Sequence, residues 1–194
     1  MEVAIGLKAR TGRAVLVAVG GSSSQPVFVG RSELRLLPEG AFAPYHAAED
    51  LAPSAARKSV NASIAAAHDL ARAGIGDAVS RLEAAGHIVR ATGVLVGLGM
   101  PAWTVEEILA VHVRMHKAEG ELFRDVLVAG ARGCGLAIET LPDKSALDDA
   151  ARKLRVTPST LATRLAELGK SAGVPWRKDE KEAAAAALVA LSAP

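Results

Sequence analysis

The chain has 194 residues, of which half are apolar and only 3% are aromatic, so its core is expected to consist of Ala, Val, Leu and Ile. Its 23 basic and 21 acidic residues leave a net charge of +2, which argues against a heavily basic coat for nucleic acid but allows a local basic patch. The sequence shows no apolar run of membrane-spanning length and no signal-peptide pattern, and its single cysteine excludes an internal disulfide. We therefore expect one cytoplasmic domain over residues 1–194, with no membrane partner.

The first part of the chain predicts three strands. VAIGLK (3–8) and RAVLVAVG (13–20) are apolar runs separated by RTG, in which Gly12 can take a positive φ. VFVGRSELRLL (27–37) follows a Gly-Ser turn and ends in alternating polar and apolar residues, which is the pattern of a half-exposed strand. Residues 3–37 are therefore predicted to form a three-stranded antiparallel meander.

Helices and strands alternate after a long loop, PEGAFAPYHAAEDLAP (38–53). The predicted elements are a helix over 54–85 that Gly74 and Gly76 weaken and Gly86 ends, a strand over 87–99, a helix over 104–132 that Thr104 caps, a strand over 136–142, and helices over 145–156, 157–170 and 179–191. This order predicts an α/β fold: a mixed sheet, made of the three-strand meander plus two further strands, with helices on both faces.

AARKLRVTPSTLATRLAELGK (150–170) looks like a helix-turn-helix. Thr157 is expected to cap its second helix and Pro158 to open it, while Arg155 stands at the turn position where such motifs usually carry glycine. The residues that would face a nucleic-acid groove are Ser159, Thr160, Thr163 and Arg164. Two packed helices with a capped turn are also common in any α-rich domain, so ordinary packing is the alternative interpretation.

The order of elements resembles the ribonuclease H-like fold, and especially the RuvC-type Holliday-junction resolvases. KAEGELFRDVLVAGARGCGLAIETLPDK (117–144) is similar to the segment in which that family has a helix, a Gly-bounded end, an edge strand and a proline followed by a lysine. Lys144 is therefore a candidate for nucleic-acid contact, although on its own it is a solvated charge. KDEKEAAAAALVAL (178–191) is similar to the family's last helix, which begins with acidic residues and continues as an Ala/Leu run.

The sequence departs from that family at the residues which cut nucleic acid. Active members have an aspartate in the first strand, a glutamate at the end of the fourth, and acidic residues or a histidine on the last helix, and such carboxylates hold two divalent metal ions. Here Lys8 stands where the first aspartate is expected, and VLVGLGMP (94–101) contains no glutamate. Asp179 and Glu182 remain as candidate catalytic carboxylates. Because a lysine brings positive charge to the cation's place, two-metal nuclease activity is not expected.

HVRMHKAEGE (112–121) carries ionisable residues within a predicted apolar stripe. At about 100° per residue, His112, His116 and Glu119 fall on the buried side of the helix. Two imidazoles one turn apart can bind a transition metal ion such as zinc, with Glu119 as a further ligand or catalytic group. Tyr45 and His46, which are expected to be exposed in the long loop, are candidates to complete the site. The alternative is that buried histidines merely hydrogen bond, with Glu119 as a partner.

Three functions follow from these patterns. The favoured one is a catalytically degenerate RuvC-like domain that binds nucleic acid or a protein partner. The second is an enzyme that depends on a divalent metal held by His112, His116 and Glu119. The third is a structural homo-oligomer whose Ala-rich helices pack against a second copy of the chain.

Overall fold

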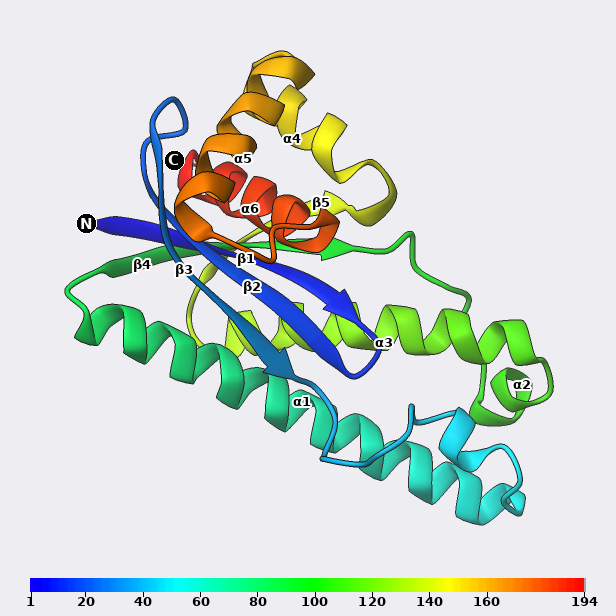
Figure 1. Cartoon of the computed structure of the whole chain (residues 1–194). Helices are drawn as coiled ribbons and strands as arrows, with labels where there is room; N and C mark the ends of the chain where they lie inside the picture. The colour runs from blue at the N-terminus through cyan, green and yellow to red at the C-terminus, as the bar shows by residue number, and fades with distance from the viewer. Residues whose placement is uncertain (194) are drawn as a thin grey trace.

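The computed structural model describes residues 1–193 and contains a five-stranded mixed sheet with helices on both faces (Figure 1). The strands are β1 (Glu2–Arg10), β2 (Arg13–Gly21), β3 (Pro26–Arg35), β4 (Ile88–Val96) and β5 (Ala137–Pro142). They lie in the order β3-β2-β1-β4-β5, with β2 antiparallel to both β1 and β3, β4 parallel to β1, and β5 parallel to β4. The predicted α/β mixed sheet and its meander are confirmed.

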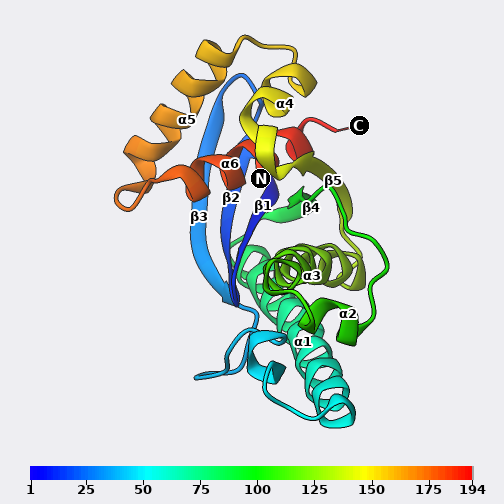
Figure 2. The ribbon, with the colours of Figure 1, turned by 90° about the vertical axis from the view of Figure 1, so that its right-hand side faces the viewer.

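Helices divide between the two faces of this sheet (Figure 2). One face carries α1 (Pro53–Ala84) and α3 (His112–Gly133), and the other carries α4 (Ala146–Lys153), α5 (Pro158–Ala172) and α6 (Lys178–Leu191). Shorter elements are α2 (Val105–Leu109) and the 3-10 helices η1 (His46–Ala48) and η2 (Asp143–Ser145). Across residues 1–193, no helix combines the length and the apolar character needed to cross a membrane.

The alanine run of α6 packs directly on two glycines of the sheet. Gly6 of β1 and Gly93 of β4 are partners in register. A Cβ added at Gly6 would lie 1.8 Å from the carbonyl oxygen of Ala183, and one added at Gly93 would lie 2.1 Å from that of Ala186. The chain's own sheet buries the alanines of α6, so this helix offers them no exposed surface for packing against a second copy.

The opposite face of β1 carries larger apolar side chains. Ile5 and Leu7 pack in one core cluster with Phe123 of α3. Since side chains alternate along a strand, Gly6 and Lys8 point the other way, toward α6. Lys8, which stands where the resemblance expects an aspartate, is therefore a buried residue on the α6 face, with 5% of its surface exposed.

The first of the long helices, α1, is continuous where the sequence predicts weakness. Both glycines face other parts of the fold. A Cβ added at Gly74 would lie 3.4 Å from the side chain of Leu34, and one added at Gly76 would lie 3.8 Å from Sγ of Cys134. Close packing of this kind offsets the low helix propensity of glycine. Gly86, with φ of +82°, follows the end of the helix as predicted.

The predicted helix over 104–132 is two helices in the structure. Thr104 caps the start of α2 as predicted, and the structure adds the reciprocal bond from its backbone N–H to the side chain of Glu107, which makes a capping box. The chain is then extended at Val111, with φ of −142°, and α3 begins at His112. The first turns of α3 extend past the strand ends, where no sheet covers them (Figure 1). His112 and His116 are consequently exposed, so the prediction of two buried histidines is wrong.

Candidate functional site

A buried ion pair occupies the place where the resemblance expects a metal-binding aspartate. The ammonium of Lys8 donates a hydrogen bond to the carboxylate of Asp143, which follows β5, and lies 3.0 Å from Oε2 of Glu182 in α6. The side chains of Lys8 and Glu182 are only 6% and 5% exposed. Oε2 of Glu182 accepts no hydrogen bond within residues 1–193, so the ammonium is its main source of compensating charge.

Arg124 extends this network toward the end of β4. Its guanidinium donates to Asp143 at 2.7 Å and lies 3.7 Å from Glu121 of the same helix. The carboxylate of Glu121 rests on Gly97, where an added Cβ would lie 2.2 Å from Oε1. The segment at the end of the fourth strand contains no glutamate, but Glu121 of α3 places its carboxylate next to that segment. Helical spacing alone could not reveal this approach, because it depends on how α3 crosses β4.

The two carboxylates that the sequence proposed as catalytic are both paired with cations. Asp179, at the start of α6, accepts a hydrogen bond from Nε of Arg10 at 2.7 Å and a second from the same guanidinium. Glu182 faces Lys8, and its other oxygen lies 3.6 Å from Lys178. These carboxylates lie on the last helix, where the resemblance expects acidic residues, but cations of the chain itself already balance their charges.

The cations also set the acidity of these carboxyls. The hydrogen bond from Arg10 is the main reason that the pKa of Asp179 lies below its ordinary value. For Asp143 the largest single influence is burial, which raises the pKa, but the hydrogen bonds and charges of Lys8 and Arg124 together outweigh it and lower the pKa.

These lowered pKa values predict a loss of stability in acid. A carboxyl whose pKa is lower in the folded chain stabilises it above the ordinary aspartate pKa of 3.8, and this contribution disappears as the pH falls through the folded value. We expect the urea midpoint of the protein to drop below about pH 4. Asp179→Asn should reduce that drop, whereas Asp69→Asn, an exposed control on α1, should preserve it. Equal pH profiles for all three proteins would contradict the assignment.

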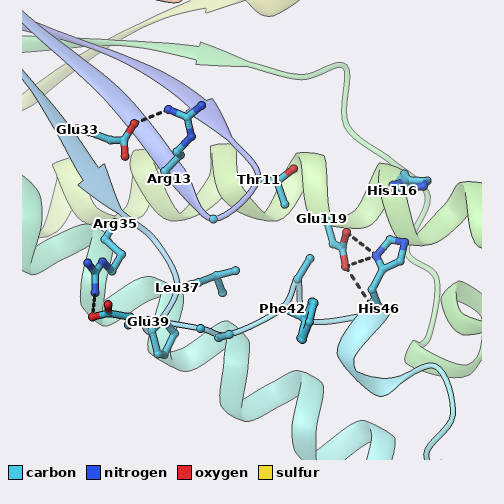
Figure 3. Close-up of a pocket in the computed structure, with 15 residues that line it drawn as sticks. Thr11, Arg13, Glu33, Arg35, Leu37, Glu39, Phe42, His46, His116 and Glu119 are labelled. Carbon is cyan, nitrogen blue, oxygen red and sulfur yellow. Dashed lines mark hydrogen bonds and ion pairs between the residues drawn. The ribbon is translucent and has the colours of Figure 1, made fainter.

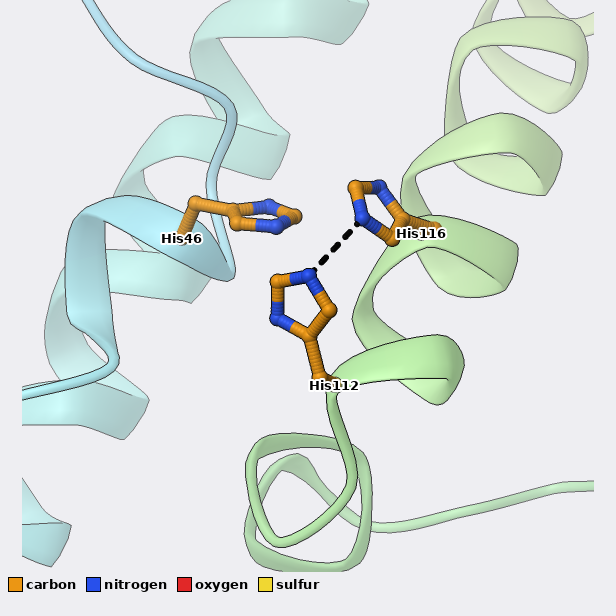
Figure 4. A group of neighbouring side chains, drawn as sticks. All are labelled: His46, His112 and His116. Atoms are coloured by element: carbon orange, nitrogen blue, oxygen red, sulfur yellow. Dashed lines mark hydrogen bonds between the residues drawn. The ribbon is translucent and has the colours of Figure 1, made fainter.

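A second cluster of ionisable groups lies where η1 meets the start of α3. His46, His112 and His116 each offer a ring nitrogen, and these atoms all lie within 4.8 Å of one another (Figure 4). The Nε2 atoms of His112 and His116 are 3.1 Å apart. His46 therefore joins the predicted pair, although it comes from a distant part of the sequence.

Glu119 lies buried beside these histidines and anchors the loop that carries His46. Its Oε1 accepts backbone N–H bonds from Tyr45 at 3.1 Å and from His46 at 3.2 Å. Both of its oxygens lie 2.9 Å from Nδ1 of His46 (Figure 3). Because a carboxylate only accepts, Nδ1 of His46 is the donor, and Nε2 is the ring nitrogen that the neutral side chain can offer to a ligand. The sequence expected Tyr45 to be exposed; it is buried, and it contributes its backbone N–H to Glu119.

A groove of about 740 Å³ opens beside the histidines. Figure 3 shows its wall, in which two surface ion pairs, Arg13 with Glu33 and Arg35 with Glu39, are prominent. The lining residues come from the β1–β2 turn, the end of β3, the loop after it and the histidine cluster: Thr11, Gly12, Arg13, Glu33, Arg35, Leu37, Pro38, Glu39, Gly40, Ala41, Phe42, Ala43, His46, His116 and Glu119.

The residues predicted to contact nucleic acid fall into two separate groups. Lys144, in η2 after β5, lines a pocket of about 360 Å³ with Lys117 and Arg124. The other group lies on α5, which packs over β3, while β5 forms the opposite edge of the sheet (Figure 2). This group consists of Ser159, Thr160, Thr163 and Arg164.

The turn that leads into α5 has the geometry expected of its sequence. Arg155 takes a left-handed conformation, with φ of 54°, where glycine is usual. The Thr157 side chain accepts a hydrogen bond from the backbone N–H of Thr160 at 3.1 Å, which confirms the predicted cap. Leu161 and Leu165 bury the inner face of α5, so the helix pair is an integral part of this face of the domain.

No protein-family model and no curated protein sequence matches the chain. Solved structures of RuvC are among those similar to it in fold. RuvC of T. thermophilus in complex with Holliday junction substrate has a TM-score of 0.52 and 11% identity, over 97% of this chain and 92% of that chain. A Thermus thermophilus RuvC structure has a TM-score of 0.51 and 11% identity, over 96% and 92%. The chain therefore has the ribonuclease H-like fold in the arrangement found in RuvC.

Proposed function

We propose that the chain binds nucleic acid on its RuvC-like scaffold and does not cleave it by a two-metal mechanism. The observation that carries this proposal is the burial of Lys8 between Asp143 and Glu182. A two-metal site needs free carboxylates that clamp the cations. Here an ammonium already neutralises them, and a metal ion that displaced it would leave a buried lysine without a partner. The domain is thus degenerate as a nuclease.

Basic side chains next to this network support contact with phosphates. Lys117 and Lys144 are exposed and belong to no ion pair in the part of the chain that the structure describes. Both line the pocket that Arg124 borders, and the 79% exposed side chain of Leu98 stands beside them. A similar RuvC structure was determined in complex with Holliday junction substrate, which makes DNA the first ligand to test.

The exposed side of α5 is a second candidate surface for the same ligand. Ser159 and Thr163 are exposed on it, and the left-handed turn at Arg155 gives α4 and α5 the sharp connection of a helix-turn-helix. A protein partner or a second copy of the chain is the competing occupant of either surface. Measurement of mass in solution with and without DNA separates these alternatives.

The binding test uses labelled four-way junction, duplex and single-stranded DNA in fluorescence anisotropy over a range of salt concentrations. We expect affinity to fall steeply with salt, because bound phosphates release counterions. Lys117→Ala/Lys144→Ala should reduce the slope of log K against log salt by about 2, since each neutralised phosphate contributes about 0.9. Lys58→Ala/Arg132→Ala removes the same charge elsewhere and should leave the slope unchanged.

Two results would decide against the proposal, and one would move the contact to the other candidate surface. Absence of binding at low salt would exclude a nucleic-acid ligand of this kind. An unchanged slope in Lys117→Ala/Lys144→Ala, with a reduced slope in Ser159→Ala/Arg164→Ala, would move the contact to α5. Cleavage of any of these substrates with Mg²⁺ or Mn²⁺, abolished by Asp179→Asn, would show that the nuclease centre works despite Lys8.

A further inference from the structure

We propose that His46, His112 and His116 bind one divalent transition-metal ion of the zinc class, with a fourth coordination position open to the groove. Zinc binds imidazole nitrogens at about 2.0–2.1 Å with tetrahedral geometry, so its ligand nitrogens stand about 3.3 Å apart. The Nε2 atoms of His112 and His116 are 3.1 Å apart, and the ligand atoms of all three residues lie within 4.8 Å (Figure 4). Movement of the exposed rings of His112 and His116 toward His46 would bring the three nitrogens to the spacing of three tetrahedral ligands.

The hydrogen bonding of His46 prepares it to act as a ligand. Glu119, only 4% exposed, accepts from Nδ1 of His46 and from two backbone N–H groups of the same loop. A carboxylate behind a histidine ligand is the usual outer partner of a metal site, because it orients the ring and raises its basicity. Glu119 is thus a positioning residue and not the third ligand that the sequence suggested. The third ring comes from η1.

Mutual hydrogen bonding does not account for three rings at one exposed place. Their centroids are 4.6, 4.7 and 5.2 Å apart, and two of the rings face solvent, where water would satisfy their nitrogens equally well. Glu119 anchors the loop through two backbone N–H groups, and its further contact with Nδ1 of His46 turns Nε2 of that ring toward the other two histidines. A shared cation gives each imidazole a partner.

The surroundings indicate a working metal site and not a closed structural one. Structural zinc sites use four protein ligands, whereas catalytic sites use three and leave one position to water or substrate. Here three histidines converge, and His46 and His116 line the groove of about 740 Å³. A metal in this place would supply a bound water of lowered pKa, which is suited to hydrolysis. The inference does not depend on nucleic-acid binding, because it uses none of the residues assigned to it.

The test measures zinc content of the purified, tag-free protein and titrates it with Co²⁺, whose visible absorption reports tetrahedral coordination. We expect one equivalent of metal and a tetrahedral spectrum. His112→Ala and His116→Ala should each weaken affinity by more than about 100-fold, because loss of an outer partner alone typically weakens it by about 10- to 100-fold. Glu119→Gln should fall in that smaller range.

The matched control is His68→Ala, an exposed histidine on α1 that lies outside the cluster and should leave the affinity unchanged. Circular dichroism checks that each variant is folded. The proposal is overturned if the parent protein holds no stoichiometric metal after dialysis, or if His112→Ala/His116→Ala binds Co²⁺ as tightly as the parent. Equal losses in His68→Ala would likewise show that uptake is non-specific.

Discussion

Replacing Lys8 with methionine should destabilise the fold by about 3–5 kcal/mol, the effect typical of removing one partner from a buried ion pair. Methionine has a similar length and no charge, so it fills the space and leaves the carboxylates of Asp143 and Glu182 facing each other. Most of the loss is expected at Glu182, which loses the ammonium that faces it, because Asp143 keeps its hydrogen bond of 2.7 Å from Arg124. Urea unfolding followed by circular dichroism measures the difference.

Two further variants identify the cause of that loss. Lys8→Met/Glu182→Gln should recover part of the stability, because it removes the unpaired charge together with its partner. Lys153→Met breaks the surface pair of Lys153 with Glu139 and should change stability by less than about 1 kcal/mol. A Lys8→Met protein as stable as the parent would mean that water reaches these carboxylates and that the network is not a buried one.

Gly6→Ala and Gly93→Ala should each destabilise the fold by more than about 3 kcal/mol, at or beyond the upper end of ordinary overpacking. The reason is that the new methyl group would meet backbone, which cannot rotate away as a side chain can. The nearest atoms are carbonyl oxygens of α6, at 1.8 Å from the Cβ at Gly6 and 2.1 Å from that at Gly93. The whole helix must therefore move off the sheet.

Gly30→Ala is the matched control for these two changes. Gly30 also lies in a strand of the sheet, in β3, but a Cβ added there meets nothing within 4 Å. Its stability should stay within about 1 kcal/mol of the parent. If all three alanine variants unfold at the same urea concentration as the parent, α6 does not lie at backbone distance from β1 and β4.

The fold was predictable from sequence because its signals are local. Alternating and apolar runs separated by turn residues specify the meander, and Thr104 and Thr157 mark helix starts through bonds to residues three positions later. The break before His112 was missed because no glycine or proline marks it. The break follows from the packing of α2 and η1 around the N-terminal turns of α1. These elements share a small core that includes Ile108, Met115 and Tyr45.

The histidine cluster was predictable only in part, because some of its contacts join segments that are far apart in the sequence. Spacing of four residues paired His112 with His116, since neighbours one helical turn apart share a face. Adding His46 required the long loop to be held against α3 by Glu119, which is a contact between segments 73 residues apart. The exposure of His112 and His116 also depends on tertiary structure, because it is determined by where the sheet ends beneath α3.

The α/β order of elements and the lysine in the first strand can be read from the sequence, since both are properties of short segments. The surroundings of that lysine depend on how the segments pack together. Asp143 follows β5 and Glu182 belongs to α6, and they meet Lys8 because Gly6 and Gly93 let α6 settle onto the sheet. Charge pairing of this kind depends on distances across the fold, and distances across the fold are set by packing and not by spacing along the chain.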